Sequence, residues 1–127
     1  VLPALMRTEK LQSRSQKAGV DMGTLFPPVD ALRTALDRLA GALEQKDVSG
    51  ADFALGEMLF TMAAAARLFD LDPEFSLYQA CDRFVERFSA AEQLAAEQGK
   101  SLDAYSRGEL LSLWEQAEKG ALNSKNV

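Results

Sequence analysis

One acid and two arginines, on neighbouring predicted helices, are the residues of this chain most able to do chemistry. Glu57 lies among apolar residues in ADFALGEMLFTM, and Arg83 and Arg87 are one helical turn apart in RFVERF. Carboxylates bind hard cations and guanidinium groups bind phosphate, so an acid facing cations on the next helix is what a helical metal and phosphate site needs. One acid is nevertheless few for a metal cluster.

Glu57 has two interpretations. On a helix its neighbours three and four positions away are mainly apolar: Phe53, Ala54, Phe60 and Thr61. This spacing predicts a carboxylate near the apolar face, where it needs a cation or hydrogen-bond donors to offset its desolvation. The cation can be Mg²⁺, which makes Glu57 a metal ligand, or it can be Arg83 or Arg87, which makes a structural ion pair.

The two arginines also have two interpretations. Each of them stands next to a phenylalanine, and a pair one turn apart can hold a phosphate bidentately. The same pair can instead form ion pairs with Asp82 and Glu86 on a solvated helix face.

Basic residues form a stripe along the first predicted helix at spacings of three and four. The stripe consists of Arg7, Lys10, Arg14 and Lys17. Lys10 and Arg14 at its centre are candidate nucleotide or polyanion ligands, although a stripe of charge is more often a solvated face.

The apolar spacing predicts helices and no strand. Helices are expected over residues 2–18, 28–45, 51–69 and 73–98, with a loop at 20–27 and a short last helix from Ser106, which forms a capping box with Glu109. The helix over 51–69 is expected to bury some combination of its large residues: Phe53, Leu55, Leu59, Met62 and Phe69. The predicted fold is an all-α bundle of four to five helices.

Four consecutive alanines, at positions 63–66, mark a place where helices can approach closely. They suit either a tight crossing inside the bundle or the contact between two copies of the chain. The apolar stripe of the helix over 28–45 has the spacing of a surface that packs on another helix: Val29, Leu32, Leu36, Leu39 and Leu43.

Composition limits the class of protein. The chain has 127 residues, 47% of them apolar, which predicts one domain over 1–127. Its first residue is not Met, so the chain can be the C-terminal part of a longer protein. A net charge of −5 argues against general nucleic-acid binding. One cysteine and no histidine exclude a disulfide framework and the usual zinc sites. With no apolar run that could span a membrane, we expect a cytoplasmic protein.

Several segments, in their order and spacing, resemble a known family over about residues 2–118. They are LPALMRTEKLQSRSQKAGVD at the start, LGEMLF and AAAARL at 55–67, RFVERF at 83–88, and then QGKSLD and LWEQAEK. The chain resembles the MazG nucleoside triphosphate pyrophosphohydrolases, particularly the C-terminal domain of two-domain members. The resemblance implies a helical fold, a homodimer or higher oligomer, and a nucleoside triphosphate as ligand.

The resemblance also implies a metal-dependent reaction. Family members hold Mg²⁺ with a Glu-Glu-x-x-Glu motif on one helix and a Glu-x-x-Asp motif on the next, and they release pyrophosphate and a nucleoside monophosphate. In this sequence the first motif is matched by Thr34, Ala35 and Arg38, so all three acids are absent. In the second motif, Ala54 replaces the Glu and Glu57 replaces the Asp.

At the other positions of the resemblance, some family residues are kept and others are replaced. Arg83 replaces a Lys of the family, whereas Phe84, Arg87 and Phe88 are kept. Two family Asn positions carry other residues, Ala64 and Cys81, and the family's aromatic pair is replaced by Val20 and Met22 around Asp21. The residues of the scaffold therefore match, while those that hold metal largely do not.

Three functions remain open from the sequence. The first is a MazG-like domain that has lost most or all hydrolysis and acts in dimerisation or nucleotide sensing. The second is an active Mg²⁺-dependent enzyme in which Glu57, Asp37, Glu44 and a second chain rebuild the site. The third is a helical protein-interaction module with no nucleotide ligand.

Overall fold

The computed structural model describes residues 3–125, and the side chains of residues 3–122. The chain divides into two compact units, Val1–Ser76 and Leu77–Val127. Throughout the described residues the regular structure is helical, with no strand, so the all-α prediction is confirmed. None of the described helices is long and apolar enough to cross a membrane. That the whole chain is a single domain stays a prediction.

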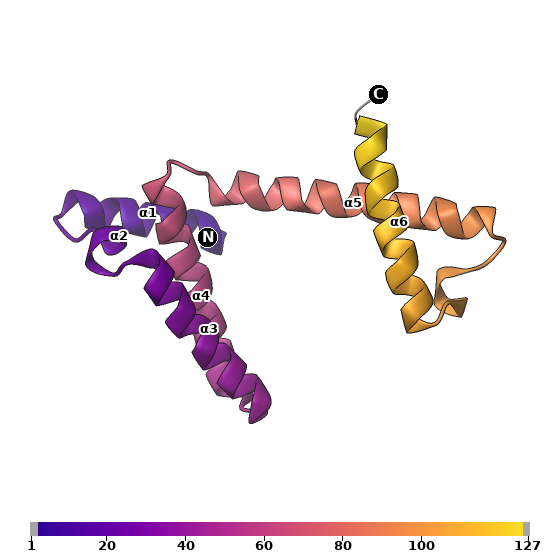
Figure 1. Ribbon diagram of the computed structural model, residues 1–127. Helices are drawn as coiled ribbons and strands as arrows, with labels where there is room; N and C mark the ends of the chain where they lie inside the picture. The colour runs from indigo at the N-terminus through magenta and orange to yellow at the C-terminus, as the bar shows by residue number, and fades with distance from the viewer. Residues whose placement is uncertain (1–2, 126–127) are drawn as a thin grey trace. The chain divides into compact units, whose positions relative to one another are not determined.

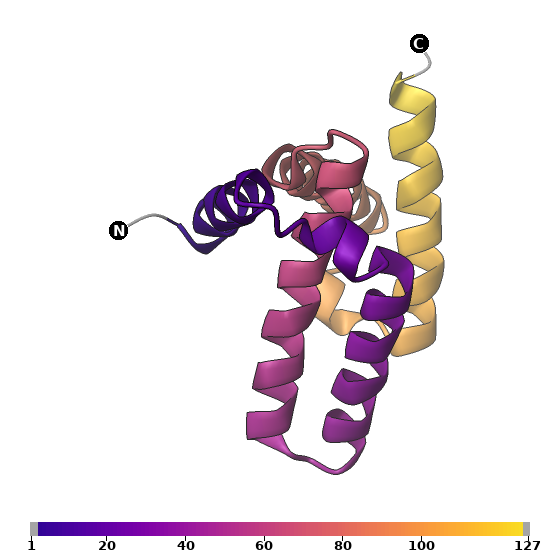
Figure 2. The ribbon, with the colours of Figure 1, turned by 90° about the vertical axis from the view of Figure 1, so that its left-hand side faces the viewer.

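The first unit is built on a helical hairpin. Helices α3 (Pro28–Glu44) and α4 (Val48–Leu68) run antiparallel and side by side, while α1 (Ala4–Lys17) and the single turn α2 (Met22–Leu25) pack on α4 (Figures 1 and 2). The second unit contains most of α5 (Pro73–Glu97), a 3₁₀ turn at Leu102–Ala104, and α6 (Arg107–Lys125). There α6 crosses α5, as Figure 1 shows.

Local sequence sets the helix ends. Gly19, with a φ of 102°, follows the end of α1, and Pro28 is the first residue of α3, where its missing N–H costs nothing. The Ser106 hydroxyl accepts a hydrogen bond from the Glu109 N–H at 3.2 Å, and the Glu109 carboxylate accepts one from the Ser106 N–H at 3.0 Å. The predicted capping box at the start of α6 is thereby confirmed.

Two boundaries differ from the sequence prediction because of aspartate caps. Residues 20–27 were expected to be a loop, but the Asp21 carboxylate accepts a hydrogen bond from the Gly23 N–H at 3.1 Å and begins α2. The Asp47 carboxylate likewise accepts one from the Gly50 N–H at 3.0 Å, so α4 begins at Val48 instead of near residue 51. Both acids satisfy backbone donors that have no partner within the helix.

The core is made of small residues. In the described part of the chain every buried apolar residue except Leu113 is an alanine: Ala35, Ala54, Ala63, Ala64, Ala91, Ala95 and Ala117. The large residues that the sequence predicted to be buried in α4 are instead exposed, among them Phe53 at 67% and Leu59 at 57%. The prediction of those core residues was wrong, because alanine spacing, and not the large side chains, sets where α4 meets its neighbours.

Candidate functional site

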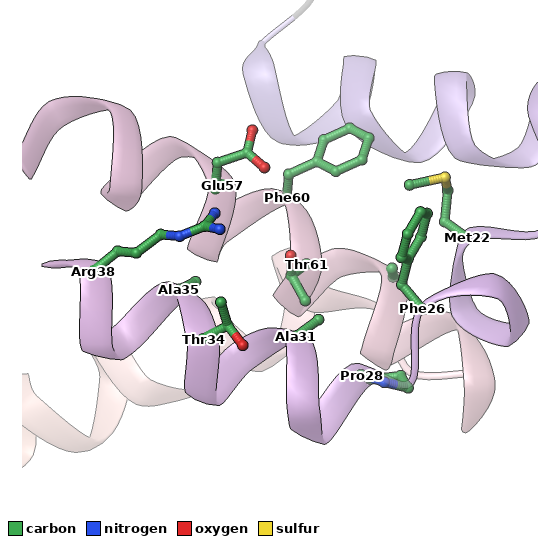
Figure 3. A pocket seen from close by; sticks show the side chains of 11 residues that line it. Met22, Phe26, Pro28, Ala31, Thr34, Ala35, Arg38, Glu57, Phe60 and Thr61 are labelled. Atoms are coloured by element: carbon green, nitrogen blue, oxygen red, sulfur yellow. The ribbon is translucent and has the colours of Figure 1, made fainter. Parts of the chain in front are cut away.

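A pocket of about 570 Å³ lies in the first unit, on the hairpin formed by α3 and α4. Its floor carries small residues of both helices, and α2 and the segment that follows it close one end (Figure 3). The pocket is lined by Met22, Phe26, Pro28, Ala31, Thr34, Ala35, Arg38, Glu57, Phe60, Thr61 and Ala64.

Charged and apolar groups occupy different ends of this pocket. Arg38 on α3 and Glu57 on α4 lie at one end, and the Arg38 guanidinium extends toward the side where the Glu57 carboxylate lies (Figure 3). Met22 and Phe26 lie at the other end, with the ring of Phe60 between the two groups. The pocket therefore offers one cation and one anion beside an aromatic wall.

Close packing brings the two helices of the hairpin together at this place. Ala35 on α3 is 5% exposed and Ala54 on α4 is 2% exposed. The connection between them is tight, since Lys46 adopts a left-handed φ of 57° directly before the Asp47 cap. Ala63 and Ala64 are also buried within this unit, so the alanine run serves an internal crossing, one of the two roles expected for it.

The α2 turn is held near the pocket by its contact with α4. A Cβ added at Gly23 would meet Leu68 Cδ2 at 2.9 Å, which shows how closely the two elements approach. Helix α1 also packs on α4, where Gln12 is buried and its side-chain amide donates a hydrogen bond to the Phe60 carbonyl at 2.9 Å. Arg67 of α4 also donates to the side chain of Gln16.

The residues that the sequence resemblance places at the two acidic motifs come together in this structure. Thr34, Ala35 and Arg38 line the pocket from α3, and Glu57 lines it from α4. Ala54 is buried one turn before Glu57. The structure thus brings together residues that the sequence links only through that resemblance.

Glu57 differs from expectation in its surroundings. The sequence predicted a carboxylate near the apolar face, yet the side chain is exposed. Because water can solvate the exposed carboxylate, Glu57 needs neither a metal ion nor an ion pair to offset a desolvation cost. The two proposed substitute ligands, Asp37 and Glu44, are also exposed on α3, and neither lines the pocket.

The residues of this pocket do not fit a divalent metal ion. Mg²⁺ is held by several oxygen ligands, whereas the pocket supplies one carboxylate, two threonine hydroxyls and a guanidinium. Over the described residues, no three acidic, cysteine or histidine side chains are grouped so that they could hold a metal ion.

Arg87 has partners within its own unit. Its Nε donates a hydrogen bond to the Trp114 carbonyl at 2.9 Å, and its Nη2 lies 3.4 Å from Glu118 Oε2. Arg83 is exposed and lines a second hollow of about 450 Å³ together with Phe84, Arg87 and Trp114. Lys10 and Arg14 are exposed on α1 and line none of the pockets described here.

Sequence reasoning missed the apolar end of the pocket. The sequence does not point to Met22 and Phe26, which lie at the end opposite the charges, or to Phe60, whose ring lies between the two ends. The available signal is Asp21, which caps the turn α2 that carries Met22. In the sequence, Arg38 stands out only as a cation at a position where the resemblance implies an acid.

Sequence comparison shows which known proteins this chain is similar to. No family model matches the chain. The chain is 30% identical over 120 residues, 93% of its length, to a nucleoside triphosphate pyrophosphohydrolase of Escherichia coli K12. It is 28% identical over 120 residues to a protein of Thermotoga maritima named nucleoside triphosphate pyrophosphohydrolase/pyrophosphatase MazG. The chain is related to the MazG family. It spans 46% of the length of each of these two relatives.

The relationship to the MazG family supports the resemblance drawn from the sequence over nearly its whole span. The matched 120 residues include both helices of the hairpin and the arginine segment of α5. The assignment of individual motif positions, and their loss of acids, stays a prediction.

Proposed function

We propose that this chain is a MazG-like domain with little or no pyrophosphohydrolase activity, which acts in dimerisation or nucleotide sensing. The observation that carries the proposal is the pocket between α3 and α4. At the positions that resemble the family's acidic motifs it has one acid, Glu57, and one cation, Arg38.

Electrostatics supports the loss of metal-dependent hydrolysis. A guanidinium about 5 Å from a metal ion repels it by roughly 3 kcal/mol per unit of metal charge at an effective dielectric of about 20, and by about 1 kcal/mol in bulk water. The exposure of Arg38 puts the true penalty toward the lower figure. Even that penalty adds to the missing carboxylates, which normally supply the attraction.

The competing proposal is an active enzyme with Mg²⁺ as cofactor and relocated ligands. It needs Asp37 and Glu44 to reach the pocket, but both are exposed on α3 away from its lining. A second copy of the chain would have to bring them in. We therefore favour the inactive form and treat turnover as the result that overturns it.

The assay measures pyrophosphate release. Purified chain with Mg²⁺ or Mn²⁺ is incubated with each common and oxidised nucleoside triphosphate, beside the E. coli relative as positive control. We expect no release above the rate without protein. Turnover that disappears in the Glu57→Ala variant, but persists in the Asp52→Ala variant on the same helix, would overturn the proposal.

Exposed apolar side chains support the homodimer. Leu36 on α3 is 50% exposed and Leu43 is 63% exposed, and they lie seven residues apart on one face. Phe53 and Leu55 are also exposed on α4. Large apolar surfaces of this kind usually mark protein–protein contacts. Sedimentation equilibrium should give a dimer mass, and the Leu36→Glu/Leu43→Glu variant should lower it.

Nucleotide sensing is separated from a pure interaction module by thermal melting. A nucleoside triphosphate that raises the melting temperature more than salt of equal ionic strength supports sensing. No change in melting temperature supports the interaction module instead.

We propose the cytoplasm as the compartment of this protein. The free thiol of Cys81 is exposed, which accords with a reducing environment.

A further inference from the structure

The pocket of the first unit is asymmetric, and the asymmetry specifies a ligand. One end carries the guanidinium of Arg38, and the other end carries Phe26 and Met22 (Figure 3). The ring of Phe60 lies between these two ends. A molecule that fits both ends has an anionic group at one end and a flat ring at the other. A nucleoside phosphate has this arrangement.

We propose that Arg38 replaces the metal ion of this site, so that the pocket binds a nucleoside phosphate directly and without a divalent cation. The proposal rests on the nucleotide-sensing role above and deepens it, because it names the binding group and removes the metal requirement. It concerns binding alone and includes no bond-breaking step.

The guanidinium of Arg38 is suited to this role. Its planar fork can donate two parallel hydrogen bonds to a phosphate. Among the residues that the structure describes, none forms a hydrogen bond or ion pair with Arg38, so its donors are available to a ligand. The side chain is exposed, which gives the ligand access.

The apolar end supplies the second contact. Phe26 is 56% exposed, and the ring of Phe60 is half-buried between it and the charged end. Aromatic rings stack on a flat heterocycle, and the thioether of Met22 adapts to such a ring. The volume of about 570 Å³ lies within the range of about 300–1,000 Å³ that is usual for small-molecule sites.

The charge of Glu57 allows the two kinds of site to be distinguished, because its removal should change the nucleotide affinity in opposite directions. Glu57 lies at the Arg38 end, so its negative charge weakens the attraction for phosphate. Removing the charge while keeping the shape, as in Glu57→Gln, is expected to strengthen binding. In a metal-dependent site the same change would weaken binding, because the last carboxylate ligand would be lost.

The experiment is calorimetric titration with ATP, GTP, CTP and UTP in EDTA at low salt. At least one of them should bind with a Kd of about 10 μM to 1 mM. Arg38→Ala should weaken that binding at least tenfold, Arg38→Lys should weaken it less, and Glu57→Gln should strengthen it about threefold. Inorganic triphosphate should bind at least tenfold more weakly than the nucleotide, and Phe26→Ala should remove this difference.

The control variant is Arg33→Ala, which removes an equal charge from an exposed position on the same helix outside the pocket. It should change the Kd less than twofold. Three results would overturn the inference: no binding in EDTA, binding that appears only with Mg²⁺, or an equal loss in Arg33→Ala and Arg38→Ala. Each is distinct from pyrophosphate release, which would overturn the proposed loss of activity instead.

Discussion

The guanidinium of Arg87 lies over the ring of Trp114, 4.5 Å from its centroid. The same side chain donates a hydrogen bond to the Trp114 backbone carbonyl and pairs with Glu118. Three different interactions of one residue thus fasten α5 to α6. Phe84, one turn earlier, adds a tilted ring contact with Trp114 at 5.6 Å. This makes Arg87, which the sequence suggested as a phosphate ligand, a residue with structural contacts.

We expect Arg87→Ala to lower the free energy of unfolding by about 2 kcal/mol. A partly exposed cation–π contact contributes about 0.5–1 kcal/mol, a hydrogen bond from a charged group about 1.5 kcal/mol, and a surface ion pair about 0–1 kcal/mol. Urea denaturation followed by far-UV circular dichroism measures the change. Arg83→Ala, which removes the exposed arginine one turn away, should cost less than about 0.5 kcal/mol. Equal losses in the two variants would contradict the structural role of Arg87.

The Glu109 carboxyl should make the free energy of unfolding depend on pH in the acidic range. Hydrogen bonds from the Ser106 backbone and hydroxyl, and then from Lys100, lower the pKa of this carboxyl from 4.5 to about 2. A lowered pKa means that the folded state favours the charged form, so this contribution is complete above pH 4.5 and is lost as the pH falls toward 2. Urea midpoints of the wild type should fall over this range.

The matched variants isolate that contribution. Glu109→Gln should flatten the fall in the midpoint between pH 4.5 and pH 2, because the titrating group is gone. Glu115→Gln, which lies further along α6 outside the cap, should keep the wild-type slope. High salt should reduce the part that comes from Lys100, since the pair is solvent-exposed. An unchanged slope in Glu109→Gln would contradict the assignment.

The pocket should accept a metal ion once its acids are supplied. Thr34→Glu/Arg38→Glu places two carboxylates at positions i and i+4 of α3, beside Glu57 on α4. We expect calorimetry to detect Mg²⁺ binding to this variant with a millimolar Kd and none to the wild type. Arg33→Glu, which forms an acidic pair with Asp37 outside the pocket, is the control and should not bind. Binding by the wild type would contradict the absence of a metal site.

Gln12 is expected to matter for stability although it has no part in the site. It is 3% exposed, and its amide nitrogen reaches the Phe60 carbonyl, while its Oε1 has no hydrogen-bond partner. Gln12→Ala should lower the free energy of unfolding by about 1–3 kcal/mol through the lost bond and the space left behind. Gln12→Met, which keeps the volume and removes the unsatisfied oxygen, should cost less. A smaller loss for Ala than for Met would contradict this.

The helices could be predicted from the sequence because their signals are local. Gly19, Pro28, and Ser106 with Glu109 mark their helix ends through backbone chemistry that does not depend on the rest of the fold. The short turn α2 was missed because a single carboxylate, that of Asp21, decides it. Periodicity alone has no means of detecting one helical turn.

The packing could not be predicted in the same way. Periodicity places Phe53, Leu55 and Leu59 on apolar positions of α4, but it cannot tell which apolar positions face another helix of the same copy. The structure shows that alanines face inward. For the site, resemblance linked Thr34, Arg38 and Glu57, whereas the aromatic wall required knowing that α2 lies against α4.

The interior of alanines has a thermodynamic consequence. Methyl groups shield little hydrocarbon from water, so melting a lone copy should show a small heat-capacity increment for a protein of 127 residues. Much of the favourable burial would then come from association, and mass action makes such a protein sensitive to dilution. Calorimetric scans should show an unfolding transition that moves to lower temperature as the protein is diluted.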